Sequence, residues 1–224
     1  LALKYRPLNF QDLIGQEYLV ETIQKSIQQN KIPNAYIFTG IRGVGKTTTA
    51  RIVAKMLNCT VFDKNNNPDL INCEQAKAIT EDRHPDVIEI DAASNTSVEN
   101  AREIIENVKY NPVLGKYKVY IVDEVHMLSK SAFNALLKTL EEPPPHSKFI
   151  FATTEISKVP ITILSRCQRF DLRRVEKKTL SDFLKSIAKK EDITISNEAL
   201  NLIVKASDGS VRDSLSIFCL LYTS

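Results

Sequence analysis

The sequence predicts an α/β fold in which helices cover both faces of a parallel β-sheet, followed by a small all-helical part. Short apolar runs alternate with helical patterns: YIFTG, DVIEIDA, KVYIVDE, KFIFATT and CQRFDLR. These runs are continuously apolar, which is typical of strands buried on both faces. Their alternation with helices indicates a parallel sheet. After Arg174 the strand patterns stop and helical patterns continue.

Helices are predicted where apolar residues recur at helical spacing. One stripe, in SAFNALLKTLEE before the prolines of EEPPPH, consists of Phe133, Leu136, Leu137 and Leu140. Two later stripes consist of Leu180, Phe183, Leu184, Ile187 and Ala188, and of Leu200, Ile203 and Val204. Gly209 is expected to stop a helix, and Ser210 to open the next one in a capping box with Asp213. We therefore expect an α/β domain over residues 1–173 and a helical domain over 174–224.

Composition excludes several classes of protein. The chain has 224 residues, of which 43% are hydrophobic and 25% charged, and its formal net charge is +3. That charge neither favours nor excludes nucleic acid, because a local basic face can bind a phosphate backbone. The four cysteines are scattered and predict no disulfide framework. Neither a signal peptide nor a run of roughly 18 apolar residues is found, so we expect a cytoplasmic protein without a membrane partner.

The segment GIRGVGKT, from Gly40 to Thr47, fits the phosphate-loop pattern G-x-x-x-x-G-K-[ST] between a predicted strand and a predicted helix. Glycines let backbone N–H groups point at phosphate oxygens, and the helix N-terminus favours the anion. Lys46 is expected to reach the β- and γ-phosphates, and the Thr47 hydroxyl to bind Mg²⁺. The alternative is a coincidental match. The predicted nucleotide contacts of this segment are Gly40, Gly43, Val44, Gly45, Lys46, Thr47 and Thr48.

The strand KVYIVDE ends in two carboxylates, Asp123 and Glu124. A phosphate-loop protein needs an acid on a neighbouring strand to hold Mg²⁺, and Asp123 fits this role. Glu124 can polarise an attacking water, which predicts hydrolysis rather than binding alone. The alternative is a strand that runs out into solvent with two surface acids.

Several segments together resemble a known family: GIRGVGKT, YIVDEVHMLSKSAFNALLKTLEEPP, FIFATTE, ILSRCQRF, GSVRDSLS and the opening KYRPLNFQDLIGQE. They are similar to the gamma/tau subunits of bacterial DNA polymerase III, the AAA+ ATPases of the replicative clamp loader. The resemblance implies a P-loop AAA+ domain with a helical lid domain, and an ATP-hydrolysing motor that loads the sliding clamp onto primed DNA. The implied partners are the delta and delta-prime subunits, further gamma/tau copies, the clamp and primed DNA. The implied holoenzyme is classed as a DNA-directed DNA polymerase, a nucleotidyltransferase.

The resemblance also assigns roles to single residues. Lys46 and Thr47 match the Walker A contacts. Asp123 and Glu124 match the Walker B pair, so that Thr47 and Asp123 are the implied Mg²⁺ ligands. Thr154 matches the sensor 1 position and Arg212 the sensor 2 arginine of the lid, with a solvated helix residue as the alternative for Arg212. The implied catalytic residues are Lys46, Glu124, Thr154 and Arg166.

Arg166 lies in TILSRCQRF and has no acidic residue within three positions on either side. It matches the family's arginine finger, which reaches the γ-phosphate bound to an adjacent subunit and stabilises charge in the transition state. A phosphate partner on another copy would account for the lack of a local carboxylate. The alternative is a surface arginine that pairs with a distant acid.

Further contacts are expected around the adenine and at DNA. Tyr5, Arg6, Pro7 and the segment from Leu13 to Gly15 are expected to border the adenine, with ordinary packing of the N-terminal arm as the alternative. Lys130 and Lys138 lie on the helix after the Walker B strand and are candidates for contacts to DNA phosphates. The alternative for this pair of lysines is a solvated charged face.

The zinc module of the family is incomplete in this chain. Cys59 and Cys73 match the first and third of its four cysteine ligands, whereas Leu70 and Ala76 hold the other two positions. Structural zinc is bound by four Cys or His ligands, and His84 aligns with none of them. We therefore expect no zinc, with a two-cysteine remnant as the alternative. The segment FDKNNNPD is expected to be a flexible surface loop.

Two other functions remain open. The chain could be a catalytically silent scaffold of the same complex, similar to delta-prime, or another AAA+ machine such as a Holliday-junction helicase motor. The intact Lys46, Asp123 and Glu124 argue against the first, and the SRC and DEVHMLS segments argue against the second. The ending IFCLLYTS departs from the family pattern, so we expect a truncated or non-native end without the collar-forming third domain, with natural divergence as the alternative.

Overall fold

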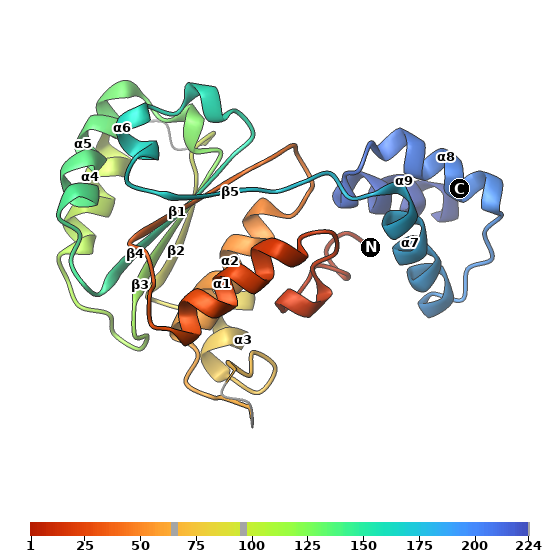
Figure 1. Cartoon of the computed structure of the whole chain (residues 1–224), viewed down its shortest axis with the longest axis horizontal. Helices are drawn as coiled ribbons and strands as arrows, with labels where there is room; N and C mark the ends of the chain where they lie inside the picture. The colour runs from red at the N-terminus through yellow and green to blue at the C-terminus, as the bar shows by residue number, and fades with distance from the viewer. Residues whose placement is uncertain (64–66, 95–97, 224) are drawn as a thin grey trace.

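The computed structural model describes residues 1–63, 67–94 and 98–223, and its centre is a parallel β-sheet (Figure 1). The strands are β1 (Ala35–Thr39), β2 (Val87–Asp91), β3 (Lys118–Asp123), β4 (Ser147–Thr153) and β5 (Gln168–Asp171). Their order in the sheet is β2-β3-β4-β1-β5, and each neighbouring pair is parallel. The predicted parallel sheet is therefore confirmed.

Burial differs between the inner and outer strands of the sheet. Every residue of β1 and β4 is buried, and so are all residues of β3 except Asp123. In the outer strand β5, Phe170 is buried while Gln168, Arg169 and Asp171 are exposed. In β2, the other outer strand, Val87 to Ile90 are half-buried and Asp91 is exposed. The expectation that all five runs are buried on both faces therefore holds for the inner strands and is wrong for β2 and β5, because an edge strand has a neighbour on one side only.

Helices form a layer on each face of the sheet (Figure 1). On one face, α1 (Glu17–Gln28) and α2 (Lys46–Asn58) pack against Tyr36, Phe38 and Ile121. On the other face, α4 (Val98–Val108), α5 (Lys130–Glu141) and α6 (Ile161–Leu164) pack against Tyr120, Phe149 and Phe151. The predicted stripe of α5 faces this second core, in which Phe133, Leu136 and Leu140 are buried.

A short helix, α3 (Glu74–Thr80), packs beside α2 at the edge of the first layer. Three single-turn 3₁₀ segments complete this part of the chain: η1 (Phe10–Asp12), η2 (Val125–Met127) and η3 (Ile156–Lys158). Residues 64–66, within the segment that we expected to be a flexible loop, lie outside the described residues. None of the helices in the described ranges is long and apolar enough to cross a membrane.

The C-terminal part is all-helical and has its own core. It consists of α7 (Lys177–Lys190), α8 (Asn197–Ser207) and α9 (Val211–Thr223), whose apolar stripes meet in one cluster. Gly209 has a φ of 81° between α8 and α9, and Ser210 Oγ accepts a hydrogen bond from the N–H of Asp213 at 3.2 Å. The predicted helix stop is therefore confirmed. Of the predicted capping box the serine half is confirmed, whereas the N–H of Ser210 donates to the Ser207 carbonyl at 2.8 Å instead of to Asp213. The division into domains at residue 173 remains a prediction.

Candidate nucleotide-binding site

The site lies at the edge of the sheet where the parallel strands end. Because β1, β3 and β4 are adjacent and parallel, the phosphate loop after β1, the acids that close β3 and the threonines that close β4 come together. The loop itself turns through Gly40, Gly43 and Gly45, whose φ values are 148°, 78° and 103°. Residues other than glycine rarely adopt such φ angles, so the conformation of this loop requires glycine at these three positions.

A cavity of about 1040 Å³ opens at this edge, which is large enough for a nucleotide. It is lined by residues of the N-terminal arm before η1, the phosphate loop, the ends of β3 and β4, and the predicted lid, which consists of the helices α7 to α9. The predicted residues among them are Tyr5, Arg6, Pro7, Gly43, Val44, Gly45, Lys46, Thr47, Thr48, Asp123, Glu124, Thr154 and Arg212. Gly40 and Arg166 are not among its lining residues. One predicted residue, Arg166, therefore lies apart from the rest.

Lys46 is the first residue of α2 and is folded back over the phosphate loop. Its Nζ donates to the carbonyl oxygens of Gly40 and Ile41, each at 3.0 Å, and the residue is 5% exposed. Burial lowers the pKa of Lys46, while Glu124 and Asp123 act in the opposite direction. A phosphate at the loop would give this buried cation a charged partner in place of two neutral carbonyl groups.

Thr47 and Asp123 meet directly across the site. Thr47 Oγ1 donates to Asp123 Oδ2 at 2.6 Å, and the N–H of Glu124 donates to Asp123 Oδ1 at 2.9 Å. Burial raises the pKa of Asp123, and the hydrogen bond from Thr47 partly offsets this. A hydroxyl and a carboxylate oxygen in contact, beside a phosphate loop, form a donor set that suits Mg²⁺ bound together with a nucleotide.

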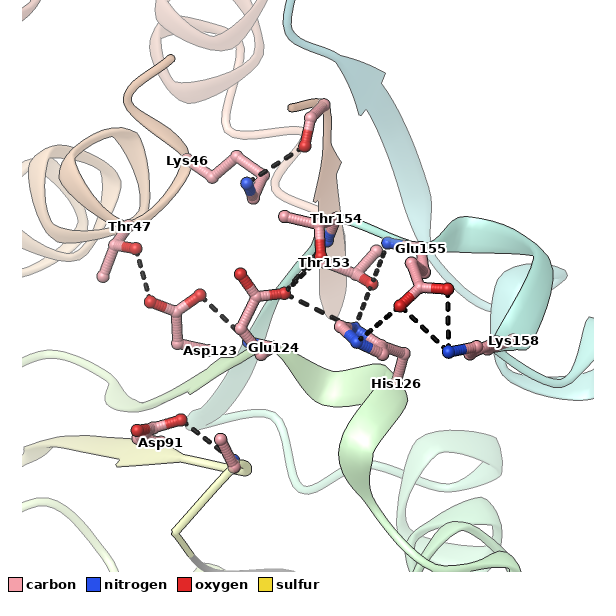
Figure 2. A network of polar contacts seen from close by, with 12 residues as sticks. Lys46, Thr47, Asp91, Asp123, Glu124, His126, Thr153, Thr154, Glu155 and Lys158 are labelled. Atoms are coloured by element: carbon pink, nitrogen blue, oxygen red, sulfur yellow. Dashed lines mark hydrogen bonds and ion pairs between the residues drawn. The ribbon is translucent and has the colours of Figure 1, made fainter. Parts of the chain in front are cut away.

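Glu124 is held by the end of β4 (Figure 2). Its Oε2 accepts hydrogen bonds from the N–H and the Oγ1 of Thr154, at 3.1 and 2.9 Å. Figure 2 shows the other carboxylate oxygen turned away from these contacts, on the side of Lys46 and Thr47. The φ of Glu124 is 46°, a left-handed conformation that costs a non-glycine residue on the order of 1–3 kcal/mol. The backbone thus turns sharply to aim this carboxylate.

The lid touches the phosphate loop directly. The N–H of Arg212 donates to the carbonyl of Gly43 at 3.2 Å, and a Cβ added at Gly43 would lie 2.1 Å from Ser210 Oγ. Position 43 therefore requires glycine for two reasons: the φ angle of the turn is positive, and a side chain would collide with Ser210 of the lid. This contact places Arg212 at the cavity, as the sequence predicted for a lid arginine.

The N-terminal arm covers the other side of the cavity. Arg6 Nε donates to Thr48 Oγ1 at 3.4 Å, and the Tyr5 hydroxyl donates to Glu191 at the end of α7. Leu13 and Ile14 line the cavity, whereas Gly15 instead faces Val175. The arm therefore bridges α2 and the lid, and its role at the adenine remains a prediction.

Arg166 follows α6 and has a partner within the chain. Its Nη2 donates to Glu141 Oε1 at 2.5 Å and its Nη1 to the Thr162 carbonyl at 2.6 Å. The alternative of a distant acid is thus realised, because Glu141 precedes Arg166 by 25 positions at the end of α5. The lack of a local carboxylate therefore does not leave Arg166 without an acidic partner in this chain. Its action on another copy remains a prediction.

Two predicted peripheral features can be placed as well. Lys130 and Lys138 are both exposed on α5, and their contact with DNA stays a prediction. Cys59, Cys73, Leu70 and Ala76 pack together in one small apolar cluster.

The residues at the zinc position do not fit a four-ligand zinc site, since two of the four positions are apolar. His84 is engaged elsewhere: its Nδ1 accepts from the N–H of Asp86 at 3.1 Å and its Nε2 faces Gln75 Oε1 at 2.5 Å. Within residues 1–63, 67–94 and 98–223, no group of three or more His, Cys, Asp or Glu side chains is arranged to hold a metal ion.

Sequence reasoning missed several residues of this region, and three of them matter for the chemistry. His126 and Asp91 line the cavity, and Glu141 holds Arg166. A signal existed for the first two, because Asp91 ends the strand DVIEIDA at the same sheet edge and His126 follows the Asp-Glu pair closely. Nothing in the local sequence pointed to Glu141.

Solved structures share the fold. The Thermotoga maritima RuvB Holliday junction branch migration motor matches with a TM-score of 0.68 at 19% identity, over 95% of this chain and 63% of that one. A DNA polymerase III gamma subunit-related protein from the same organism matches with a TM-score of 0.56 at 22% identity, over 89% of this chain and 57% of that one. At these identities the likeness shows the AAA+ fold alone.

Sequence comparison is more specific. The family described as "DNA polymerase III, delta subunit" matches residues 15–176, and "DNA polymerase III clamp loader subunit, ATPase lid domain" matches residues 179–218. DNA polymerase III subunit tau/gamma of Haemophilus influenzae is 49% identical over 97% of this chain and 31% of its own length. The tau subunit of Bacillus subtilis is 48% identical over 95% of this chain and 38% of its own length.

The chain thus spans about a third of the length of these curated relatives. The two matched families together account for both the sheet-containing part and the helical lid. The segments that first suggested the resemblance lie in both parts. The chain belongs to the gamma/tau family of bacterial DNA polymerase III clamp-loader subunits, which have the AAA+ ATPase fold.

Proposed function

We propose that this chain is an ATP-binding and ATP-hydrolysing motor subunit of a replicative clamp loader. The observation that carries the proposal is the contact between Thr47 Oγ1 and Asp123 Oδ2, with Lys46 and Glu124 lining the same cavity. Hydrolysis of a phosphate bond requires a cation, a pair of oxygen donors for magnesium and a carboxylate that faces the phosphate. Lys46, the Thr47–Asp123 pair and Glu124 provide these groups within one cavity.

Each residue has a definite task in this mechanism. Lys46 and the N–H groups at the start of α2 bind the terminal phosphates of ATP. Thr47 and Asp123 would hold Mg²⁺, which when bound would supply positive charge against the phosphates. Glu124 orients a water for attack on the γ-phosphorus and accepts its proton. Thr154 holds the Glu124 carboxylate, and Arg212 closes the lid side of the cavity.

Arg166 is proposed to act on a neighbouring copy. In the free chain its charge is directed to Glu141, outside its own cavity. A guanidinium delivered to the γ-phosphate of an adjacent subunit would stabilise the charge of the transition state there. ATP hydrolysis would then depend on contact between subunits.

The assembly and its partners are also proposals. Delta, delta-prime and further gamma/tau copies would complete the loader, and the sliding clamp and primed DNA would be its substrates, in the cytoplasm. Lys130 and Lys138 are candidates for DNA phosphate contacts, because they are exposed on one helix. Membership of a DNA-directed DNA polymerase, a nucleotidyltransferase, is proposed for the assembly, while the site of this chain supports ATP hydrolysis.

A second candidate is a catalytically silent scaffold within the same complex. The match to the family described as a delta subunit favours it, since that description covers residues 15–176. Against it stand the assembled side chains of Lys46, Thr47 and Asp123, which a silent subunit has no need to keep. The likeness to a branch migration motor concerns the fold and supports no further function.

ATP turnover, measured with and without sliding clamp and primed DNA, tests the proposal. We expect turnover that clamp and DNA increase. Glu124→Gln should lower turnover by about 100-fold or more while ATP still binds, since a general base contributes about 10²–10⁴-fold. Glu142→Gln, a change at an exposed acid outside the cavity, is the matched control. Absence of turnover would favour the scaffold, and turnover indifferent to the clamp would favour another kind of motor.

A further inference from the structure

His126 sits beneath the Glu124 carboxylate, between two acidic side chains (Figure 2). It lies in η2, two residues after Glu124, and its side chain is 6% exposed. The Nδ1 atom is 3.4 Å from Glu124 Oε2, and the Nε2 atom is 3.4 Å from Glu155 Oε1. The ring thus connects the carboxylate proposed to orient water with the segment that follows β4.

The same ring also contacts the end of β4. His126 Nδ1 lies 2.9 Å from Thr153 Oγ1, which in turn accepts the N–H of Glu155 at 3.1 Å. The carboxylate of Glu155 continues the chain of contacts to Lys158, 2.8 Å away, at the end of η3. One buried side chain therefore joins the turn after β3 to the end of β4 and the segment beyond it.

Two features of Glu124 create a need for such support. Its backbone is in the left-handed region, which the surroundings must enforce. Its Oε2 has contacts with Thr154, but this residue directly follows β4, so the contacts fix the carboxylate only while the turn after β3 stays in register with β4. His126 belongs to that turn and touches both Glu124 and Thr153, so it can hold this register.

We propose that His126 is a positioning residue for Glu124: its Nδ1 edge holds Oε2 so that the other oxygen faces the nucleotide. The inference rests on the proposed ATP hydrolysis. It assigns no proton transfer to His126, because Glu124 lies between His126 and the contact of Thr47 with Asp123 (Figure 2). The imidazole acts through the geometry of the carboxylate.

The test is a series of substitutions in the 224-residue chain with Mg²⁺ and ATP. His126→Ala should lower kcat by about 10–100-fold, the range typical for residues that orient a reacting group, with KM for ATP within about twofold. His126→Asn places an amide near the Nδ1 position and should restore kcat to within about fivefold of the unchanged chain, whereas His126→Gln, which reaches toward Nε2, should not. His146→Gln is the matched control, because His146 contacts the Val108 carbonyl at the opposite end of β4.

Three further measurements distinguish a loss of positioning from a loss of folding. Thermal unfolding must show that the variants fold. In a Glu124→Gln background, His126→Ala should cause no additional loss, because the two residues act as a unit. The affinity for ADP with aluminium fluoride, relative to ADP alone, should fall in His126→Ala and so reports on positioning even where turnover is slow.

Unchanged kcat in His126→Ala, equal losses of kcat and ATP affinity, or equal recovery by His126→Asn and His126→Gln would each overturn the assignment. A wild-type chain with neither turnover nor a preference for ADP with aluminium fluoride, even at concentrations at which copies can supply Arg166 to one another, would instead overturn the proposed function, and the assignment with it. Normal wild-type turnover with an unaffected His126→Ala would overturn the assignment alone.

Discussion

The predicted phosphate-binding residues at the end of the sheet, Lys46, Thr47 and Asp123, are called the cradle here. They differ from Arg166, which follows α6, in how firmly the fold holds their side chains. In the cradle, Lys46 is buried and Thr47 is hydrogen-bonded to Asp123 across two elements of the core. Arg166 is held by Glu141, and the side chains of this pair are 31% and 50% exposed. Parts that serve the chain's own nucleotide are thus set by folding, whereas the part proposed for a neighbour is held loosely.

The difference has an energetic basis. A solvent-exposed ion pair contributes about 0–1 kcal/mol, because water and salt compete with it. A γ-phosphate carries more charge than one carboxylate, so it can displace Glu141 at small cost. The cradle residues have no such freedom, since a buried carboxylate or ammonium group that loses its partners pays the full cost of desolvation. Assembly can therefore redirect Arg166 without disturbing the cradle.

The largest expected effect comes from removing Arg166 in a mixture of copies. One copy carries Lys46→Ala and keeps Arg166, and the other carries Arg166→Ala and keeps the cradle. Mixed, they should turn over ATP, while Arg166→Ala alone should be slower than the unchanged chain by about 1000-fold, the size of effect known for arginine fingers. Arg169→Ala, at an exposed arginine paired with Asp171, is the control. Full turnover by dilute, monomeric Arg166→Ala would contradict the proposed role in a neighbouring site.

A smaller effect is expected at Glu141. Glu141→Gln frees Arg166, and an exposed pair of at most about 1 kcal/mol corresponds to about fivefold. The concentration of copies at half-maximal turnover should therefore fall by about two- to fivefold, measured by ATPase titration. Glu142→Gln should leave it unchanged. A decrease in maximal turnover would instead mean that Glu141 orients Arg166 for the neighbour rather than restraining it.

The smallest effect concerns stability and Asp123. Burial raises the pKa of this carboxyl group in the folded chain, so folding disfavours its ionised form. Above the folded pKa the carboxylate therefore costs stability, and as the pH falls below the unfolded pKa this cost disappears. Asp123→Asn should raise the thermal unfolding temperature of the ligand-free chain at pH 7, and the gain should vanish near pH 3, measured by calorimetry. A lower unfolding temperature at pH 7 would show that the hydrogen bond from Thr47 outweighs the burial cost.

Local patterns in the sequence predicted most of the helices and strands and the residues of the cradle. The glycine spacing before Lys46, the acidic pair at the end of β3 and the apolar stripe of α5 are properties of adjacent residues, which can be recognised along the chain. The Ser210 cap and the stop at Gly209 are equally local. The expectation of full burial was wrong for β2 and β5, because an apolar run does not show whether its strand lies at the centre or at the edge of a sheet.

Contacts between distant segments needed the folded molecule. The sheet order places β4 between β1 and β3, and this order brings Thr154 to Glu124 from 30 positions away and Thr153 to His126 from 27. The same packing sets Glu141 beside Arg166 and Gly43 beneath Ser210. The sequence alone determined the elements and the phosphate-binding motif, because these follow from short-range spacing. Only the tertiary structure decided the side-chain partners of Glu124, His126 and Arg166, because the strand order and the helix packing determine which distant residues come into contact.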